Sequence, residues 1–367
     1  MKKELKKFAL KIFALVLCTL VAVASFVSCG KENEGAIVYK NPDGKVTSVL
    51  DTSFLSFWIA VQNNQYASYI SAFDAAQGWD TVVEKESGKT LRDVMLEEAV
   101  RTASSMLQAE YIHDHVCGID FTDTQADSVN EYISSLVSTF GSEKNLETEL
   151  SSYGASIGAL EKYMTLMLKY ETLYGYLYSE GGEREITPDM KKAYFEENYA
   201  IADHILFDMR GIQKDDGTIV GLTEEQEKEI WQKAEGVYSA IKAGVMTFEE
   251  AKEQYNEDYY ASEYPFGYFV TDDNTFWSEF QTAALEMQEG EIRLVRTYAG
   301  AHIMLKKPMN GELYMSNGDF NDSLSTVLSG EDYVALLETV SDGVEVSDAL
   351  VSRLDPALVK PFAFGNS

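Results

Sequence analysis

The sequence predicts an α+β protein in which a mostly helical region encloses one small sheet domain. Two observations predict this fold class. Helical periodicity runs from about residue 51 to residue 200 and returns after residue 310. Between these regions, residues 202–308 change to short apolar strands separated by capped helices, the pattern of a sheet with helices packed on it. A chain of 367 residues with 45% hydrophobic residues can bury the cores that this arrangement needs.

The N-terminus has the pattern of an export signal. Residues 1–28 combine a lysine-rich start, an apolar run and small residues before Cys29. The residues Phe26-Val27-Ser28-Cys29 resemble a lipobox, at which bacterial lipoproteins are lipidated on the cysteine and cleaved before it. We therefore expect a lipid anchor at Cys29 on the extracytoplasmic face of the cell membrane. Ordinary secretion with a free Cys29, or an uncleaved anchor, are the alternatives. Residues 29–50 are polar and predict a tether.

The cysteines and the net charge exclude some functions. Of the three cysteines, Cys18 would leave with the signal and Cys29 would be modified, so Cys117 has no partner for a structural disulfide. The formal charge of −30 repels phosphate backbones and excludes nucleic-acid binding. This acidity has two interpretations: a solvated surface that prevents aggregation, or an attraction for unfolded basic clients.

Residues 51–200 predict a series of helices. The first has apolar residues at helical spacing from Leu91 to Met106. The second begins at a capping box formed by Thr122 and Gln125 and ends at Gly141. A third covers "ASIGALEKYMTLMLKYETLYGYLYSE", and another begins at "ITPDMKKAYFEENYA", where proline takes the first helical position.

One local cluster in this region has residue types that bind metals: His113, Asp114, His115 and Cys117. On a helix, positions 113 and 117 share a face while 115 points away. A single His/Cys pair with no second cluster is weak support for zinc. We therefore expect a helix end with a half-buried Cys117, and neither a metal nor a cofactor.

Residues 202–308 predict the element order β-α-α-β-α-β-β. The strand "ADHILF" and a polar loop precede two helices, each with a capping box: Thr223 with Gln226, and Thr247 with Glu250. The strand "PFGYFV", the helix "WSEFQTAALEM" and the strands "RLVRTYA" and "AHIMLKK" follow. This order predicts an antiparallel sheet covered by helices.

This segment resembles a parvulin-type peptidyl-prolyl isomerase domain. The resemblance is carried by "ADHILF", "FEEAKEQYNED", "FGYF", "FWSEFQTAALEMQEGEI" and "RLVRTYAGAHIMLKK", in the family's order and spacing. With the lipobox and the flanking helices, the chain resembles the PrsA-like foldase lipoproteins. The resemblance implies a helical chaperone region at 51–200, a parvulin-like domain at 201–309, and C-terminal helices at 310–367 that pack with the N-terminal region.

Prolyl isomerisation needs no nucleophile, metal or cofactor. It needs an apolar slot for the ring and polar groups around the carbonyl, which together lower a barrier of roughly 18–20 kcal/mol. Two kinds of candidate residue occur in this segment. For the slot they are Phe266, Phe276 and Phe280, and for the polar floor His204, Asp258, Thr297 and His302.

The resemblance assigns a role to each polar candidate. His204 and His302 match two histidines that hydrogen-bond across the floor of the pocket. Because side chains alternate along a strand, each histidine should lie on the same face of the sheet as the residues two positions away on its own strand. Thr297 matches the threonine that supports the second histidine. Asp258 falls where the family has a cysteine or aspartate beside the twisting bond.

The resemblance also assigns the apolar candidates. Phe280 matches the phenylalanine on which proline stacks, and Phe276 takes a methionine or leucine position. Phe266 falls at the leucine of a Gly-Gly-Asp-Leu-Gly loop, in which Glu263-Tyr264-Pro265 replace the glycines and the aspartate. Tyr264 resists, and Pro265 forbids, a positive φ, so we expect this loop to run differently beside the pocket.

Two classes of function stay open at this point. The first is an enzyme that isomerises X-Pro bonds in unfolded or newly secreted proteins, and the second is a chaperone whose degenerate parvulin domain only binds peptides. An import lipoprotein would need two similar α/β lobes joined by a hinge, which the pattern lacks. A homodimer is left open.

The C-terminal segment, 310–367, predicts two amphipathic helical stretches and a short strand, "VEV". Its apolar residues are expected to be core; they are Leu324, Val327, Leu328, Val334 and Leu337.

Overall fold

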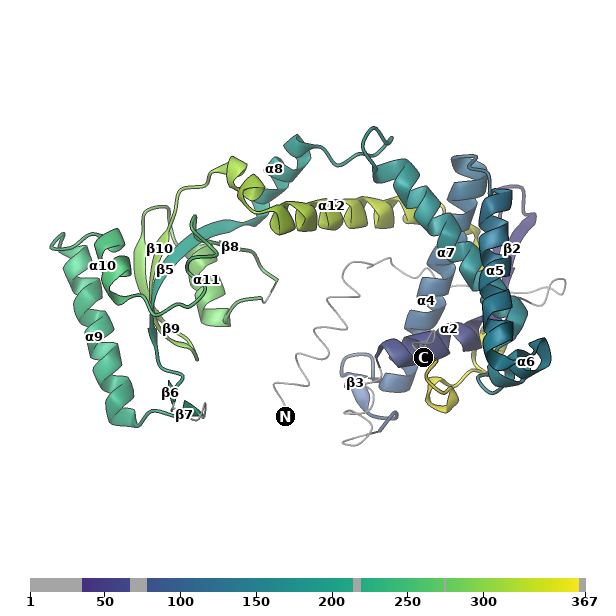
Figure 1. The fold of residues 1–367 in the computed structure, drawn as a ribbon, viewed down its shortest axis with the longest axis horizontal. Helices are drawn as coiled ribbons and strands as arrows, with labels where there is room; N and C mark the ends of the chain where they lie inside the picture. The colour runs from purple at the N-terminus through teal and green to yellow at the C-terminus, as the bar shows by residue number, and fades with distance from the viewer. Residues whose placement is uncertain (1–34, 67–77, 214–218, 274, 363–367) are drawn as a thin grey trace. The chain divides into compact units, whose positions relative to one another are not determined.

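The structure is a computed structural model that describes residues 35–66, 78–213, 219–273 and 275–362. The chain forms two compact units, one made of Met1–Glu185 and Ser329–Ser367, the other of Ile186–Leu328. The second unit is therefore an insertion in the first, as Figure 1 lets the reader follow by colour. The expected export signal and Cys29 lie outside the described residues. Among those residues, none of the helices is long and apolar enough to span a membrane.

The first unit is built from helices and a small sheet. Its helices are α2 (Thr52–Gln65), α4 (Leu91–Tyr111), α5 (Asp123–Phe140), α6 (Glu143–Ser151), α7 (Ile157–Tyr178) and α13 (Asp348–Val351), with the π-helical turn η1 (Ile112–Val116) and the 3-10 turns η3 (Ser341–Gly343) and η4 (Pro356–Leu358). The predicted capping box of α5 is confirmed, because the Thr122 hydroxyl accepts from Gln125 N and the Gln125 side chain accepts from Thr122 N. A small hairpin joins β3 (Val82–Glu84) to β4 (Lys89–Thr90).

The prediction of a tether over residues 29–50 is wrong over the part that the structure describes as strands. β1 (Ile37–Lys40) pairs with β2 (Val46–Leu50) on one edge and with β11 (Val344–Val346) on the other, both antiparallel. The sequence gives the physical reason, since "AIVY" and "VTSVL" are rich in β-branched residues that fit a half-buried sheet. The polar residues between the strands form the hairpin turn rather than a tether.

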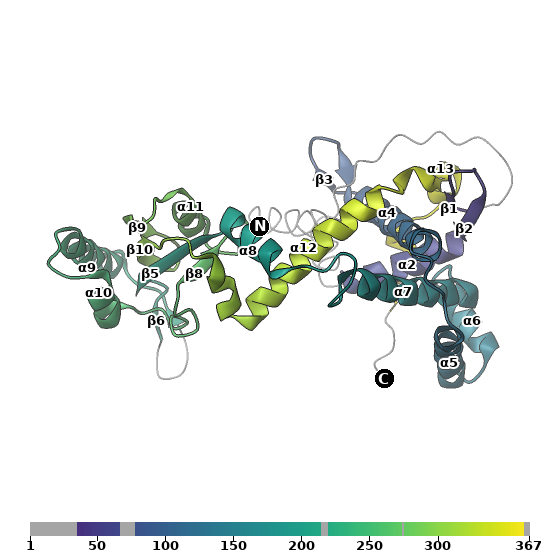
Figure 2. The ribbon, with the colours of Figure 1, turned by 90° about the horizontal axis from the view of Figure 1, so that it is seen from above.

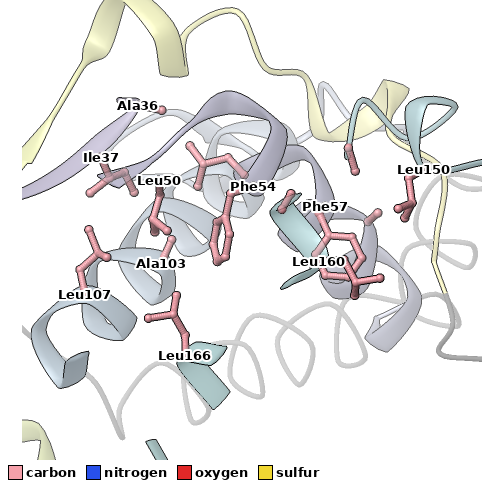
Figure 3. Packing of buried hydrophobic residues seen from close by; sticks show 14 of the residues in the cluster. Ala36, Ile37, Leu50, Phe54, Phe57, Ala103, Leu107, Leu150, Leu160 and Leu166 are labelled. Atoms are coloured by element: carbon pink, nitrogen blue, oxygen red, sulfur yellow. The ribbon is translucent and has the colours of Figure 1, made fainter. Parts of the chain in front are cut away.

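The core of the first unit lies between this sheet and helices α2, α4 and α7 (Figure 3). Phe54 and Phe57 of α2 are each no more than 1% exposed, and Leu107 and Leu160 come to the same cluster from α4 and α7. Burying one such side chain stabilises the fold by roughly 1.5–3 kcal/mol.

The C-terminal segment returns to the N-terminal helices, as predicted. β11 is the predicted "VEV" strand, and it completes the three-stranded sheet. Helix α12 (Gly318–Glu338) brings Tyr333, Leu336 and Leu337 against Ala109 of α4 and Leu173 of α7. Of the expected core residues, Leu324 and Leu337 are buried, Leu328 and Val334 are half-buried, and Val327 is 37% exposed.

The second unit is a four-stranded antiparallel sheet with helices on both faces. The strand order is β8-β5-β10-β9. The sheet strands are β5 (Ala200–Asp208), β8 (Tyr268–Val270), β9 (Ile292–Arg296) and β10 (Gly300–Lys306), and the helices are α8 (Pro188–Asn198), α9 (Glu224–Lys242), α10 (Phe248–Tyr255) and α11 (Ser278–Glu286). The predicted order of elements is confirmed, with one addition. The polar loop after β5 contains the short paired strands β6 (Ile212–Gln213) and β7 (Ile219–Val220).

Strand alternation divides the two faces of this sheet. Ile205 and Phe207 of β5 and Ile303 of β10 pack against α9 and α10, which lie side by side in Figures 1 and 2. Ala202 of β5 and Met304 of β10 pack on the opposite face, against α11. The second face is the one that carries the candidate site.

The compact unit extends beyond the predicted domain 201–309 at both ends. Helix α8 and the 3-10 turn η2 (Gly311–Ser316) share a small core in which Phe195, Tyr314 and Leu324 are buried. This core also includes Ile201 of β5, so the two flanking segments fold with the sheet.

Candidate active site

His204 and His302 lie on the same face of the sheet, as alternation predicts. In the antiparallel register Met304 is opposite His204, so His302 is its diagonal neighbour. The Nδ1 atoms of the two rings are 3.0 Å apart, and the residues are 8% and 3% exposed. The two histidines are 98 positions apart in the sequence, and the pairing of β5 with β10 brings them into hydrogen-bond contact.

The hydrogen bond between the histidines is part of a longer row. Thr297 Oγ1 is 2.8 Å from His302 Nε2, and His204 Nε2 is 2.9 Å from Asp258 Oδ2. The backbone N–H of Ala299 donates to Thr297 Oγ1 over 3.0 Å. The four polar residues predicted for the floor are thus joined in one connected row.

With both rings neutral, one assignment of hydrogens satisfies every contact in the row. Thr297 donates to His302 Nε2, so the ring hydrogen of His302 lies on Nδ1 and is donated to His204 Nδ1. The ring hydrogen of His204 then lies on Nε2 and is donated to Asp258, which as a carboxylate can only accept. The row therefore ends at one anion.

A glycine is required where this row enters β10. Gly300 has φ +148°, and a Cβ built there would lie 2.0 Å from the carbonyl oxygen of Phe207 on β5. Any side chain at this position would push β10 away from β5 and separate the histidines. This close approach explains the glycine between Thr297 and His302.

Asp258 is held by the free edge of β5, beyond the end of β8. The Asn256 side chain accepts from Leu206 N over 2.8 Å and from Asp258 N over 3.2 Å. Glu257 N donates to the Leu206 carbonyl over 2.9 Å, and the Glu257 carboxylate accepts from Asp208 N. These bonds fix the loop after α10 so that Asp258 faces His204.

Tyr268 is a site residue that the sequence analysis missed. Its hydroxyl donates to Asp258 Oδ2 over 2.5 Å, the same oxygen that accepts from His204. Tyr268 pairs with Ala202 across the sheet, on the face that His204 also uses. The alternation of side chains along the strand "YFV" places Tyr268 on this face and could have identified it from the sequence.

The apolar part of the site is a group of contacting rings. Phe280 lies 5.2 Å from the His204 ring and 5.4 Å from the His302 ring, and Phe276 stacks on it at 5.6 Å. Phe280 is only 2% exposed, so Phe276, which is half-buried, is the more accessible ring of the pair. Phe266 is 43% exposed and belongs to none of the described hydrophobic clusters, so the structure does not bring it into this group.

The replaced loop has a simple conformation. Tyr264, Pro265, Phe266 and Gly267 form a turn in which Gly267 N donates to the Tyr264 carbonyl over 3.0 Å. Proline takes the second position of the turn, which suits its fixed φ. Gly267, at φ +98°, keeps the left-handed conformation. The loop folds without the other glycines, and it stacks the Tyr264 ring on Tyr268 at 4.3 Å.

Asp258 is a carboxylate in a partly dry environment. Burial raises the pKa of Asp258, but hydrogen bonds from His204, Tyr268 and Tyr260 N outweigh it and hold that pKa well below its usual range. Burial, followed by the bond to Asp258, raises the pKa of Tyr268. Burial, with repulsion from His204, lowers the pKa of His302 to about 3. At neutral pH, Asp258 is ionised while Tyr268 and His302 are neutral.

The side chains of the cluster at 113–117 lie in different surroundings. His113 is buried and its Nδ1 lies 2.7 Å from Asp114 Oδ1, while His115 is exposed and Cys117 is half-buried. Within residues 35–362, less the undescribed gaps, no group of three or more His, Cys, Asp or Glu side chains could hold a metal ion. The absence of a cofactor remains a prediction.

Comparison with known proteins identifies the sheet unit. Residues 189–306 match the family model of the PPIC-type PPIASE domain. They form a PPIC-type peptidyl-prolyl isomerase domain. The protein is thus an isomerase by domain type, and its α+β fold is that predicted from the sequence.

Solved structures of foldases are also similar to the chain. Peptidylprolyl isomerase PrsA from Bacillus anthracis shares 17% identity at a TM-score of 0.26, covering 67% of this chain and 100% of that one. PrsA from Bacillus cereus shares 18% identity at a TM-score of 0.29, and the match covers 70% of this chain and 87% of that one. Foldase protein PrsA from Streptococcus pneumoniae shares 14% identity at a TM-score of 0.24, and the match covers 70% of this chain and 87% of that one. Among curated proteins, none matches the chain.

Proposed function

We propose that the whole chain is an extracytoplasmic folding factor. Its isomerase domain would rotate X-Pro bonds of unfolded or newly secreted proteins, and its helical unit would hold those clients. The observation that carries the proposal is the row from Thr297 through both histidines to Asp258, in which the two histidine rings contact Phe280 and Phe280 stacks on Phe276. An apolar surface beside fixed polar groups is the combination that prolyl isomerisation needs, and here Asp258 is the charged member of the polar groups.

The chemistry follows from what changes during rotation. A planar amide shares electrons between nitrogen and carbonyl oxygen, which leaves the oxygen partly negative, and twisting the bond removes this sharing. A fixed carboxylate near that oxygen repels the planar form more than the twisted form. Asp258 therefore favours the twisted state, while the Phe276 ring holds the proline. His204, His302 and Thr297 orient Asp258 through their hydrogen bonds, and the bond from His204 lowers the pKa of Asp258 and so helps keep it ionised.

The alternative is a domain that binds proline peptides without isomerising them. It would need a site in which the carboxylate or its supports are missing, and the described site has all of them in contact. The loop at 263–266 was the reason for considering this alternative, and the loop folds as an ordinary turn.

An isomerisation assay on the full chain tests the proposed activity. Proline tetrapeptides with several different residues before the proline should all reach equilibrium faster with the protein than without it. Acceleration of none of them, in a protein that still binds the peptides, would establish the binding alternative.

We also propose that the protein is a lipoprotein, anchored through Cys29 on the outer face of the cell membrane. The support is the pattern of residues 1–28 and the lipobox-like residues before Cys29. Cys29→Ala should release the protein from the membrane fraction or block its maturation. Unchanged membrane association of this variant would contradict the proposal. A homodimer remains a prediction that light scattering of the soluble part can test.

A further inference from the structure

A row of aromatic rings leads from the buried histidines to the surface of the domain. The Tyr268 ring lies 5.2 Å from His204 and 5.8 Å from Phe276. Tyr264 stacks on the outer side of this group, 4.3 Å from Tyr268, and is 37% exposed. The apolar slot is thus continuous with an exposed tyrosine that comes from the replaced loop.

The row of aromatic rings lies on the side of the site that contains the carboxylate of Asp258. The Tyr268 hydroxyl donates to Asp258, the group that acts on the carbonyl, and Tyr264 stacks on the Tyr268 ring. That carbonyl belongs to the residue before the proline. One residue of extended chain spans about 3.3–3.6 Å, so the side chain of this preceding residue can reach rings one or two contacts away from the slot.

The charges around the row disfavour one class of side chain. Near the site the described residues include Asp258 and Glu257, together with Asp203 paired to Lys252 and Asp208 paired to Arg210. Carboxylates therefore outnumber cations here, and within the described part of the chain no Lys or Arg forms an ion pair with Asp258. An acidic residue before the proline would be repelled.

We infer that Tyr264 and Tyr268 form a subsite for the residue that precedes the proline, and that this subsite selects an aromatic side chain over a small or an acidic one. The inference rests on the proposed isomerase function. Tyr264 supplies an exposed ring face whose position is fixed by stacking, so an aromatic substrate residue gains ring contact at little further loss of freedom.

The test compares peptides that differ only before the proline, with phenylalanine, alanine, glutamine or glutamate at that position. For the full chain, kcat/KM should be highest for phenylalanine and lowest for glutamate. Tyr264→Ala should reduce the ratio of kcat/KM between the phenylalanine and alanine peptides about threefold to tenfold, the range expected for one aromatic pair. Tyr264→Phe should keep the ratio, because the ring is retained.

Tyr259→Ala is the matched control, since Tyr259 is 83% exposed and its ring contacts Tyr260 rather than the row. This variant should keep the wild-type ratio. Equal rates for phenylalanine and alanine peptides, or a ratio that Tyr264→Ala leaves unchanged, would overturn the inference.

Failure of the proposed function would look different. If no peptide is isomerised, the same four peptides are titrated against wild type and Tyr264→Ala by fluorescence anisotropy. Preferential binding of the phenylalanine peptide that Tyr264→Ala abolishes would support the subsite alone. Equal binding of all four would overturn the subsite as well.

Discussion

Each unit of the molecule contains a buried polar network that joins distant segments, and the two networks differ in charge balance. In the first unit, Lys169 lies 2.9 Å from Glu110 and also pairs with Asp114, and Lys162 lies 2.8 Å from Glu110. Ser48 of β2 donates to the same glutamate. Two carboxylates thus meet two ammonium groups, which leaves no net charge in this network.

The network in the isomerase domain is not balanced. It contains the carboxylate of Asp258 and, among the described residues, no Lys or Arg; His204 is bonded to Asp258, and Thr297, His302 and Tyr268 are neutral. A balanced buried network fixes how segments pack, whereas an unbalanced charge beside an apolar surface acts on whatever binds there. Burial of polar groups alone therefore does not identify an active site.

The largest effect is expected in the balanced network. Lys169→Met leaves Glu110 and Asp114 without their shared cation, and Glu110 is only 8% exposed. Loss of one partner of a buried pair destabilises a protein by ~3–5 kcal/mol. Urea titration followed by hydrogen exchange in α4 and α7 measures the free energy of unfolding of the first unit. Lys162→Met is the control and should have a smaller effect, because the Lys162 side chain is 28% exposed.

Substitution in the unbalanced network should give the reverse pattern. Asp258→Asn removes the charge and keeps the size, so kcat/KM for proline peptides should fall about 100-fold, the usual scale for one electrostatic group in an active site. The free energy of unfolding of the domain should change little, and peptide affinity should be kept. A rate loss that merely follows a loss of stability would contradict the assigned role of Asp258.

The sequence predicts this site better than its surroundings. His204, His302 and Thr297 could be found because they match the motifs and spacing of the parvulin resemblance, and strand alternation fixes the face of the two histidines. Alternation could have placed Tyr268 on this face, but its hydrogen bond to Asp258 could not be predicted, because Asp258 lies in a loop whose position depends on Asn256 and the free edge of β5. Such tertiary contacts leave no periodic pattern.

The tether shows the same limit in another region. Residues 29–50 were expected to be a tether because they are polar overall, and the sheet that β1 and β2 form there is completed by β11, some 300 positions later in the chain. The signal existed in the β-branched residues of "AIVY" and "VTSVL", but a strand is stable only with a partner. The existence of such short strands can be proposed from their composition, but which strands pair can be known only from the three-dimensional structure.

Acid should destabilise the isomerase domain through His302. The pKa of His302 is lowered by burial from 6.5 to about 3, so unfolding takes up a proton between these two values of pH. The stability that neutral His302 contributes is therefore complete above pH 6.5 and is lost as pH falls toward 3. His302→Gln should flatten this dependence by at most ~1.4 kcal/mol per pH unit. Urea titrations at several pH values, followed by hydrogen exchange in β5 and β10, measure it.

The matched control is His115→Gln, an exposed histidine of the first unit. It should leave the pH dependence of the isomerase domain unchanged. If the free energy of unfolding changed equally with pH in wild type and His302→Gln, His302 would already take up its proton in the folded domain. The hydrogen-bond directions assigned between Thr297, His302, His204 and Asp258 would then be wrong.

The smallest effect separates the positioning of Asp258 from its charge. Tyr268→Phe removes the hydroxyl that donates to Asp258 Oδ2 and keeps the ring that stacks on Tyr264. One hydrogen bond to a charged group is lost, so kcat/KM at neutral pH should fall about threefold to tenfold. The pKa of Asp258 should rise, because a bond that lowers it is gone, and the acid limb of the pH–rate profile should move to higher pH. Tyr259→Phe, at an exposed position, should change neither quantity. A rate loss of the same size at every pH would show that Tyr268 only packs, and the anion at Asp258 would then depend on His204 and the backbone of Tyr260.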